Sequence, residues 1–311
     1  SLKDKEVYFQ VFRLNFFIVL LKPRVMSLAI YTAFVGIVLA PGHISVLKSV
    51  ISIFAIAMGA GASGALNMYY DADIDKMMAR TASRPIPLGQ ISPWEAWVLG
   101  VSLAVSSIVI MGLAINWVSA TLLFMSIFCY VVIYTIWLKR FTPQNIVIGG
   151  IAGAIPPMIG WASVTGDVSI ASLVMFLIIF LWTPPHFWSL ALLCKDDYQK
   201  ASIPMLPNVV TDRTTKMHIL IYTVLTSIVG VLPTMLGFAS VTYGIIVFFL
   251  GYHFTLWAWR TFLCKEDKDI RVTKKLFLES ITYLFVLFTI LMVDHLIDMK
   301  TVERYFFSSF L

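Results

Sequence analysis

The sequence predicts an all-α polytopic membrane protein with nine transmembrane helices. The chain has 311 residues, of which 59% are hydrophobic and only 13% are charged, whereas soluble domains average about 25% charged residues. Apolar runs of about twenty residues, the length at which a helix crosses a bilayer, recur along the chain. Basic residues gather in alternate connections between these runs, as the positive-inside rule requires.

The elements are expected in the following order. Residues 1–21 mix charged side chains with aromatic residues and leucine, which predicts an interfacial helix lying on the membrane. Nine spans follow, at 25–41, 47–66, 94–113, 117–138, 145–164, 168–192, 217–237, 242–262 and 276–298. The first span is the shortest. We therefore expect one integral-membrane domain over residues 1–311, with a nine-helix bundle at 25–298 and no soluble domain.

Positively charged side chains indicate the orientation of this bundle. With the N-terminus in the cytoplasm, all of the 23 Lys and Arg residues lie in inner segments except Lys48, Lys300 and Arg304. This places the C-terminus outside. The net charge of +6 belongs to short loops beside a membrane, so it does not indicate binding of nucleic acid. Because no transit-peptide pattern is visible, we expect a bacterial inner (plasma) membrane. The polar loops at 67–87 and 194–207 are then expected to face the cytoplasm.

An acidic segment follows the second span. Asn67, Asp71 and Asp75 are spaced by four residues, so in a helix their oxygen atoms lie along one face. Such ligands suit a hard dication, and Mg²⁺ is usually held by one or two carboxylates while substrate phosphates and water complete its shell. We therefore predict an active site here, with the three side chains as catalytic and metal-binding residues. A solvated loop that anchors a membrane helix is the other interpretation.

Two arginines continue the same spacing. Arg80 and Arg84 are four residues apart, and guanidinium groups match phosphate oxygens in charge and geometry. Pro85 and Pro87 are then expected to end the helix. The sequence thus predicts that both arginines bind a diphosphate.

A second polar stretch, CKDDYQKASIPMLP at 194–207, follows the sixth span. It contains Lys195, Asp196, Asp197 and Tyr198. Because both acidic loops are predicted on one face, we expect them to hold a diphosphate and its metal ions from opposite sides. A charged loop after a span would have the same composition.

Further candidates come from single residues near span ends. Lys139 and Arg140 follow the fourth span and Arg24 precedes the first, where diphosphate contact and membrane anchoring explain a positive charge equally well; the same holds for Lys22. His186 and Trp188 lie in the stretch PPHFW within the sixth span, and ionisable residues inside a membrane commonly have a function.

These motifs together resemble a known family. The pattern of Asn67, Asp71 and Asp75 followed by Arg80 and Arg84 is similar to the first aspartate motif of the intramembrane prenyltransferases. Three further stretches resemble the haem O synthases, or protohaem IX farnesyltransferases, within that superfamily: YTIWLKRFTPQNIVIGGIAGAIPPMIGW at 134–161, PPHFW at 184–188 and DDYQKASIPMLP at 196–207. The resemblance covers most of the chain.

The resemblance implies an intramembrane bundle that uses Mg²⁺, farnesyl diphosphate as donor and haem b as acceptor at its vinyl group, with hydration to haem O. It implies that Asn67, Asp71 and Asp75 bind metal and diphosphate, that Arg80 and Arg84 bind the diphosphate, and that Asp196 and Asp197 replace the second aspartate motif. Together with the candidates from single residues, we therefore expect the following roles: catalysis by Asn67, Asp71, Asp75, Asp196 and Asp197; metal binding by Asn67, Asp71, Asp75 and Asp196; diphosphate binding by Arg24, Arg80, Arg84, Lys139, Arg140 and Lys195; haem contact by His186, Trp188 and Tyr198. The chain departs from the wider superfamily in lacking a second pair of aspartates four residues apart, and Ser202 stands where the haem branch usually has Gly.

Two other functions stay open at this point. The first is a prenyltransferase with an aromatic acid or quinone precursor as acceptor, which would share the first motif only. The second is an ion-coupled transporter, which predicts inverted repeats and acidic residues near the midplane; here the acidic residues gather at one face. As partners we expect the two substrates, membrane lipid and hand-over of the product to haem A synthase or to terminal-oxidase assembly.

Overall fold

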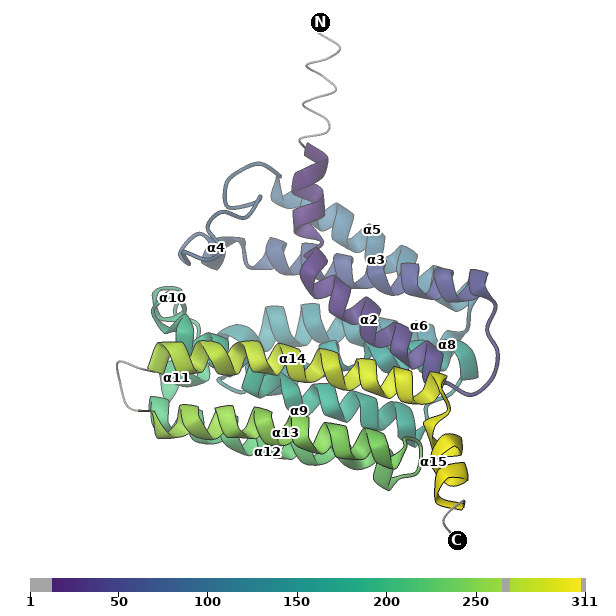
Figure 1. The fold of residues 1–311 in the computed structure, drawn as a ribbon. Coiled ribbons are helices and arrows are strands. Elements are labelled where there is room, and N and C mark those ends of the chain that lie inside the picture. Colours follow the sequence, from purple (N-terminus) through teal and green to yellow (C-terminus); the bar gives the residue numbers. More distant parts are fainter. Residues whose placement is uncertain (1–12, 265–268, 309–311) are drawn as a thin grey trace, which may run out of the picture.

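The computed structural model describes residues 13–264 and 269–308, and every regular element in these two ranges is a helix (Figure 1). Eight helical segments are long and apolar enough to cross a membrane. They are α3 (Val46–Tyr70), α5 (Pro93–Ala114), the run of α6 (Trp117–Phe128) with η1 (Cys129–Trp137) and η2 (Leu138–Arg140), the pair α7 (Asn145–Ala154) and α8 (Pro156–Thr165), α9 (Ile170–Leu193), α12 (Asp212–Met235), α13 (Val241–Leu263) and α14 (Asp269–Leu296). The predicted all-α membrane class is confirmed.

The first predicted span differs from the other eight. α2 (Pro23–Leu39) has 17 residues and forms a ninth span only together with the helical segment Arg13–Leu20, from which it bends by 52°. The bend lies at Lys22, whose φ of 49° is left-handed, directly before Pro23. Proline disfavours helical backbone in the preceding residue, which explains the break. Of the interfacial helix predicted at 1–21, residues 13–20 are helical and residues 1–12 lie outside the described ranges.

The starts of the spans follow from capping residues. At six helices a Ser, Thr or Asn side chain accepts a hydrogen bond from a backbone N–H in the first turn, which satisfies one of the donors that a helix start leaves unpaired. These caps are Ser45, Ser92, Asn116, Ser169, Thr211 and Ser240. The capping residues therefore determine where these six helices begin.

Short helices mark the two ends of the bundle. α4 (Ala72–Asp75), α10 (Lys195–Lys200) and α11 (Leu206–Val209) lie together at one end, which we call the aspartate end, and α15 (Met299–Ser308) lies at the other end beside the C-terminus (Figure 1). The placement of the aspartate end in the cytoplasm, with the N-terminus inside and the C-terminus outside, stays a prediction. The single-domain assignment does as well.

α2 and α8 pack with their backbones in contact. A Cβ atom added to Gly160 would lie 1.9 Å from the carbonyl oxygen of Ala33, and one added to Gly36 would lie 2.2 Å from that of Pro157. Small residues allow such close approach between membrane helices. Glycine is therefore required at both positions.

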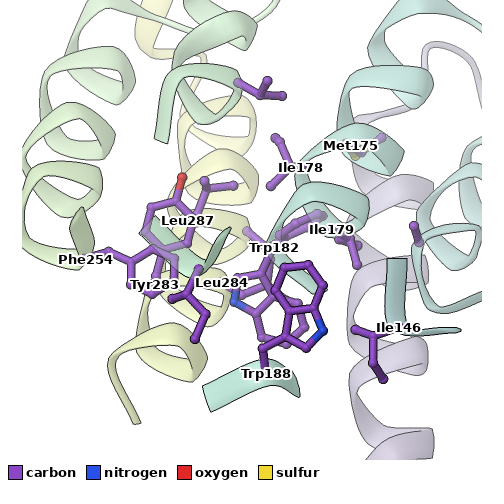
Figure 2. Packing of buried hydrophobic residues seen from close by; sticks show 14 of the residues in the cluster. Ile146, Met175, Ile178, Ile179, Trp182, Trp188, Phe254, Tyr283, Leu284 and Leu287 are labelled. Atoms are coloured by element: carbon purple, nitrogen blue, oxygen red, sulfur yellow. The ribbon is translucent and has the colours of Figure 1, made fainter. Parts of the chain in front are cut away.

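Buried aromatic side chains hold α9, α13 and α14 together (Figure 2). The Trp182 Nε1–H donates to the carbonyl oxygen of Ser280 at 2.7 Å. Phe254 of α13 stacks on Tyr283 of α14 with ring centroids 5.0 Å apart. This part of the bundle is a filled core, and it supports the polar loops at the aspartate end.

Candidate active site

Asn67, Asp71 and Asp75 follow one another by single helical turns. The Asp71 N–H donates to the Asn67 carbonyl at 2.9 Å, and the Asp75 N–H donates to the Asp71 carbonyl at 2.8 Å. α3 ends at Tyr70, and α4 continues the turn to Asp75. At most 3% of each of the three residues is exposed. The structure therefore brings the three side chains together in the arrangement that their spacing indicates.

The chain beyond Asp75 differs from the expectation of one continuous helix. The helix ends at Asp75, well before Pro85 and Pro87, and the chain continues in turns. The Thr81 hydroxyl donates to the Asp75 carbonyl at 3.0 Å and so satisfies an acceptor at this helix end. The turns fold Arg84 back, and its guanidinium donates to Asp75 Oδ2 at 2.7 Å. Arg84 reaches the aspartates through this loop and not along a helix face.

Asp71 is paired with a cation from a distant span. Lys139 Nζ donates to Asp71 Oδ2, and only 13% of the Lys139 side chain is exposed. Lys139 lies in η2, directly after the π-helical η1, and such irregular turns are common at functional positions. Burying an unpaired carboxylate costs several kcal/mol. The two ion pairs, with Lys139 and Arg84, explain how both aspartates are buried.

Lys22 is a further residue of this cluster, which the sequence did not separate from membrane anchors. Its ammonium group donates to Asn67 Oδ1. The Asn67 amide in turn donates to Asp71 Oδ2 and to Thr135 Oγ1, each at 3.0 Å. Arg24, two residues after Lys22, is exposed and makes none of these contacts. The sequence feature that distinguishes Lys22 from Arg24 is its position directly before Pro23.

Arg140 makes a separate and more exposed ion pair. Its guanidinium donates to both carboxylate oxygens of Asp73, at 2.8 and 2.7 Å, and to the Tyr70 carbonyl at 2.9 Å. The hydrogen bonds from Arg140 hold the pKa of the Asp73 carboxyl below its usual value. The structure therefore brings Lys139, and not Arg140, to the buried aspartates.

α10 contacts the loop that carries the arginines. Asp197 Oδ2 accepts a hydrogen bond from the Arg80 N–H at 3.3 Å, and the Arg80 side chain interacts with the Tyr198 phenol. Tyr198 is buried, and burial raises the pKa of its phenol, so the group stays neutral near pH 7. The two polar loops expected on one face are thus in contact.

The remaining residues of the second loop lie apart from this contact. Asp196 is exposed on α10. Lys195 pairs with Asp212 at 2.6 Å. Ser202 adopts a φ of 54°, in the left-handed region that glycine enters without strain, which accounts for the usual Gly of the haem branch at this position.

His186 and Trp188 lie within α9, which runs through both prolines of the PPHFW stretch. The His186 ring stacks between Trp182 and Phe277, with centroids 4.4 and 4.8 Å away, and its Nδ1 hydrogen bonds Ser280 Oγ at 2.8 Å. These contacts come from α9 and α14 and not from the aspartate cluster. Trp188 is buried, and its Nε1 has no hydrogen-bond partner among the described residues.

The oxygen atoms of the cluster fit a magnesium ion that is shared with a substrate. Within 13–264 and 269–308, no three His, Cys, Asp or Glu side chains come together as a complete metal site. Mg²⁺ needs only one or two carboxylates when phosphates and water fill its other positions. Asp71 Oδ1 is buried and has no hydrogen-bond partner in the described part of the chain, so it is an open ligand position. The three cations around the carboxylates suit the phosphates.

A polar cavity of about 390 Å³ lies at the opposite end of the bundle, among His43, Ser45, Lys48, Asn116 and Thr165. Asn116 already donates to the Ala162 carbonyl at 2.8 Å and caps α6. None of the predicted site residues lines this cavity. The charged and buried residues therefore place the candidate site at the aspartate end.

The fold and the aspartate cluster define the class of protein. Residues 29–281 match the UbiA prenyltransferase family, and the chain belongs to that family. It is a prenyltransferase with eight or nine membrane-spanning helices.

Within the family, the chain is similar to protoheme IX farnesyltransferases. It is 58% identical to the protoheme IX farnesyltransferase of Sinorhizobium fredii (strain NBRC 101917 / NGR234) over 279 residues, which cover 89% of this chain and 88% of the relative. It is 54% identical over 283 residues to protoheme IX farnesyltransferase 2 of Mesorhizobium japonicum, with coverage of 91% and 90%. The resemblance seen in the motifs is thereby confirmed.

Two solved structures share the fold. One is a digeranylgeranylglyceryl phosphate synthase, with a TM-score of 0.75 and 17% identity over 91% of this chain and 98% of the other. The second is a UbiA homologue from Archaeoglobus fulgidus bound to GPP and Mg²⁺, with a TM-score of 0.62 and 15% identity over 88% and 99%. At these identities the likeness concerns the fold.

Proposed function

We propose that the chain transfers a farnesyl group from farnesyl diphosphate to the vinyl group of haem b, with hydration, to give haem O and diphosphate. The observation that carries the proposal is the buried pair Asp71 and Asp75 with Lys22, Arg84 and Lys139 around it. This cluster supports binding of the donor. The identity of 58% to a protoheme IX farnesyltransferase supports haem as the acceptor.

Asn67, Asp71 and Asp75 would hold Mg²⁺ through their side-chain oxygens, and the open Asp71 Oδ1 supports this assignment. When bound, Mg²⁺ supplies positive charge to the departing diphosphate. Lys139 and Arg84 would then bind phosphate oxygens in addition to carboxylates. The roles predicted for Asp196, Arg24, Arg140 and Lys195 remain part of the proposal.

The transfer has two bond-forming steps. The carbon–oxygen bond of the allylic diphosphate breaks, its electron pair leaves with the diphosphate, and an allylic cation remains. The electrons of the haem vinyl group form the new carbon–carbon bond, and the resulting cation adds water and releases a proton. Asp71 and Asp75 are buried, and exclusion of bulk water around them would protect the allylic cation from hydrolysis.

The acceptor is proposed to lie beside α9 and α10. Trp188 Nε1 is a buried donor without a partner in the described residues, and Tyr198 is a neutral phenol beside Arg80, so both can contact a polar group of the haem. His186 already bonds Ser280 and would have to change partner to contact haem. We place the enzyme in a bacterial inner membrane with the aspartate end in the cytoplasm, and its product would pass to haem A synthase or terminal-oxidase assembly.

The experiment that tests the proposal uses the purified protein in lipid, farnesyl diphosphate, Mg²⁺ and reduced haem b, with mass analysis of the haem. A farnesylated and hydrated haem that forms only with Mg²⁺ is the expected result. Release of diphosphate with unmodified haem would contradict haem as the acceptor and favour an aromatic acid or quinone precursor. Absence of any diphosphate release would contradict the prenyl transfer from farnesyl diphosphate.

A further inference from the structure

A second group of cations lies at the aspartate end, on the side of the bundle formed by α12, α13 and α14 and away from α3 and α4 (Figure 1). The pair of Lys195 and Asp212 places the start of α12 beside α10. Lys216 Nζ donates to the Cys264 carbonyl at 3.2 Å, which places the end of α13 beside the start of α12. These helix ends are therefore at the same level of the membrane as the polar loops.

Aromatic rings hold the cations of this group. The Arg260 guanidinium lies 4.8 Å and the Lys275 ammonium 5.8 Å from the centre of the Trp257 ring. The Trp257 Nε1–H donates to His253 Nε2 at 3.3 Å, which fixes the indole. Of the four cation–ring contacts in the described residues, two involve Trp257, and a third places Arg213 over Phe262 nearby on α12 and α13. The cations thus have defined positions.

Among the described side chains of this group, cations outnumber carboxylates. Arg271, Lys275 and Glu279 lie along one stripe of α14 because they are four residues apart. Glu279 already pairs with Lys275 at 2.8 Å and with His253 at 3.2 Å. Arg260 and Arg271 are exposed, and neither pairs with a carboxylate in the contacts that the described residues make. An anionic group would therefore find unsatisfied partners at this corner.

We propose that the group formed by Trp257, Arg260, Arg271 and Lys275 binds the phosphodiester headgroup of an anionic phospholipid. A guanidinium that stacks on a ring keeps its N–H edge free for phosphate oxygens. Exposed apolar side chains adjoin the group and suit acyl chains: Trp259 is 46%, Leu263 57% and Ile270 70% exposed. Basic pockets between membrane helices at the headgroup level are suited to such lipids.

The site is independent of the proposed prenyl transfer, because none of its residues belongs to the aspartate cluster. It also differs from general anchoring by positive charge. Anchoring depends on the number of charges near the membrane, whereas a headgroup site depends on the positions of Arg260 and Lys275 on the Trp257 ring. The experiment must therefore compare equal losses of charge at different places.

Spin-labelled phosphatidylglycerol and phosphatidylcholine, each added to the full chain in phosphatidylcholine bilayers, measure the preference for an anionic lipid. We expect the wild type to prefer phosphatidylglycerol and Arg260→Gln to reduce that preference by about fivefold, the change typical for one interfacial cation. Lys48→Gln, which removes one charge outside this group, is the matched control and should keep the preference. Arg260→Lys, which keeps the charge but lacks the planar guanidinium group, should keep only part of the preference for phosphatidylglycerol.

An unchanged preference in Arg260→Gln, or an equal loss in Lys48→Gln, would overturn the proposal. If Arg260→Gln fails to fold, Arg271→Gln carries the same expectation at an exposed position of α14. Displacement of the labelled lipid by soluble inorganic phosphate at millimolar concentration would assign the site to a free phosphate and would overturn the lipid assignment.

Discussion

Lys139 and Asp71 form an ion pair across 68 positions of the chain, and the carboxylate of this pair is fully buried. Arg84 and Asp75 form a second pair at 2.7 Å. Asp71 and Asp75, both proposed to hold Mg²⁺, are therefore each neutralised by a cation that is itself suited to phosphate. Several properties of the protein depend on this arrangement.

Removal of the cation should leave Asp71 as an uncompensated buried charge. Lys139→Met should lower the free energy of unfolding by about 3 kcal/mol, because breaking a buried pair from one side is costly. The double variant Lys139→Met with Asp71→Asn should recover most of this stability and remain inactive. Thermal unfolding in detergent measures both variants, and equal instability of the double variant would show that the ion pair is not the cause.

Metal and diphosphate should bind together. Mn²⁺ alone must displace Lys139 and Arg84 from the carboxylates and meets their positive charge, whereas a diphosphate gives both cations a new partner. We expect the Mn²⁺ affinity, measured by calorimetry or electron spin resonance, to rise at least tenfold with an unreactive farnesyl diphosphate analogue, a change of about 1.4 kcal/mol. Equal affinity with and without the analogue would contradict this coupling.

The three aspartates of the acidic segment should differ in function. Asp71→Asn and Asp75→Asn should abolish haem O formation in correctly inserted protein, since both side chains are buried in the cluster. Asp73→Asn should keep most of the activity, because its side chain is 62% exposed and pairs with Arg140. Product analysis of the three variants tests this order, and activity of Asp71→Asn and Asp75→Asn would refute the proposed site.

Lys22 and Arg24 lie two residues apart but differ in burial and contacts, so the same substitution can be compared at both positions. Lys22→Gln should raise the KM for farnesyl diphosphate and reduce kcat, because its ammonium group orients Asn67. Arg24→Gln should change these constants much less, since Arg24 is exposed. Steady-state kinetics on both variants measures the two effects. A larger effect of Arg24→Gln would contradict this order and favour the diphosphate binding that the sequence predicted for Arg24.

Ser202 should be a site for stabilisation. Its φ of 54° costs a residue with a Cβ atom about 1 kcal/mol or more. Ser202→Gly should therefore raise the free energy of unfolding by up to about 1 kcal/mol, less the entropy that glycine loses on folding. Ala201→Gly, at the adjacent position with a φ of −83°, should lower it. Thermal unfolding of both variants measures the difference.

The membrane fold could be predicted from the sequence because its causes are local in the chain. Apolar runs of sufficient length and the distribution of charge indicated the spans, and eight of the nine are long single segments in the structure. The first span, predicted at 25–41, corresponds to α2 (Pro23–Leu39), which reaches spanning length only with Arg13–Leu20, and the left-handed Lys22 separates these two helical segments. The two segments together are as apolar as a membrane span, so hydropathy alone does not predict the bend between them.

The candidate site was only partly predictable, because some of its residues come together only through the tertiary structure. The spacing of Asn67, Asp71 and Asp75 is local in the chain, and the backbone hydrogen bonds place the three residues on successive turns, as this spacing indicates. The cations that meet this stripe come from other segments, and positive charge near a membrane has a second explanation in anchoring. Only the tertiary structure shows that Lys139 and Lys22 contact the cluster, whereas their neighbours Arg140 and Arg24 do not.

The backbone contact between α2 and α8 limits how the enzyme can change. Side chains elsewhere in the bundle can be enlarged or trimmed, but at Gly36 and Gly160 main-chain atoms already touch the neighbouring helix. Any atom added there would force the two helices apart, so a substitution at these positions would disrupt their packing and would not enlarge a substrate cavity. Variants with a broader range of acceptors are therefore to be sought on the other walls, where side chains and not peptide groups set the available volume.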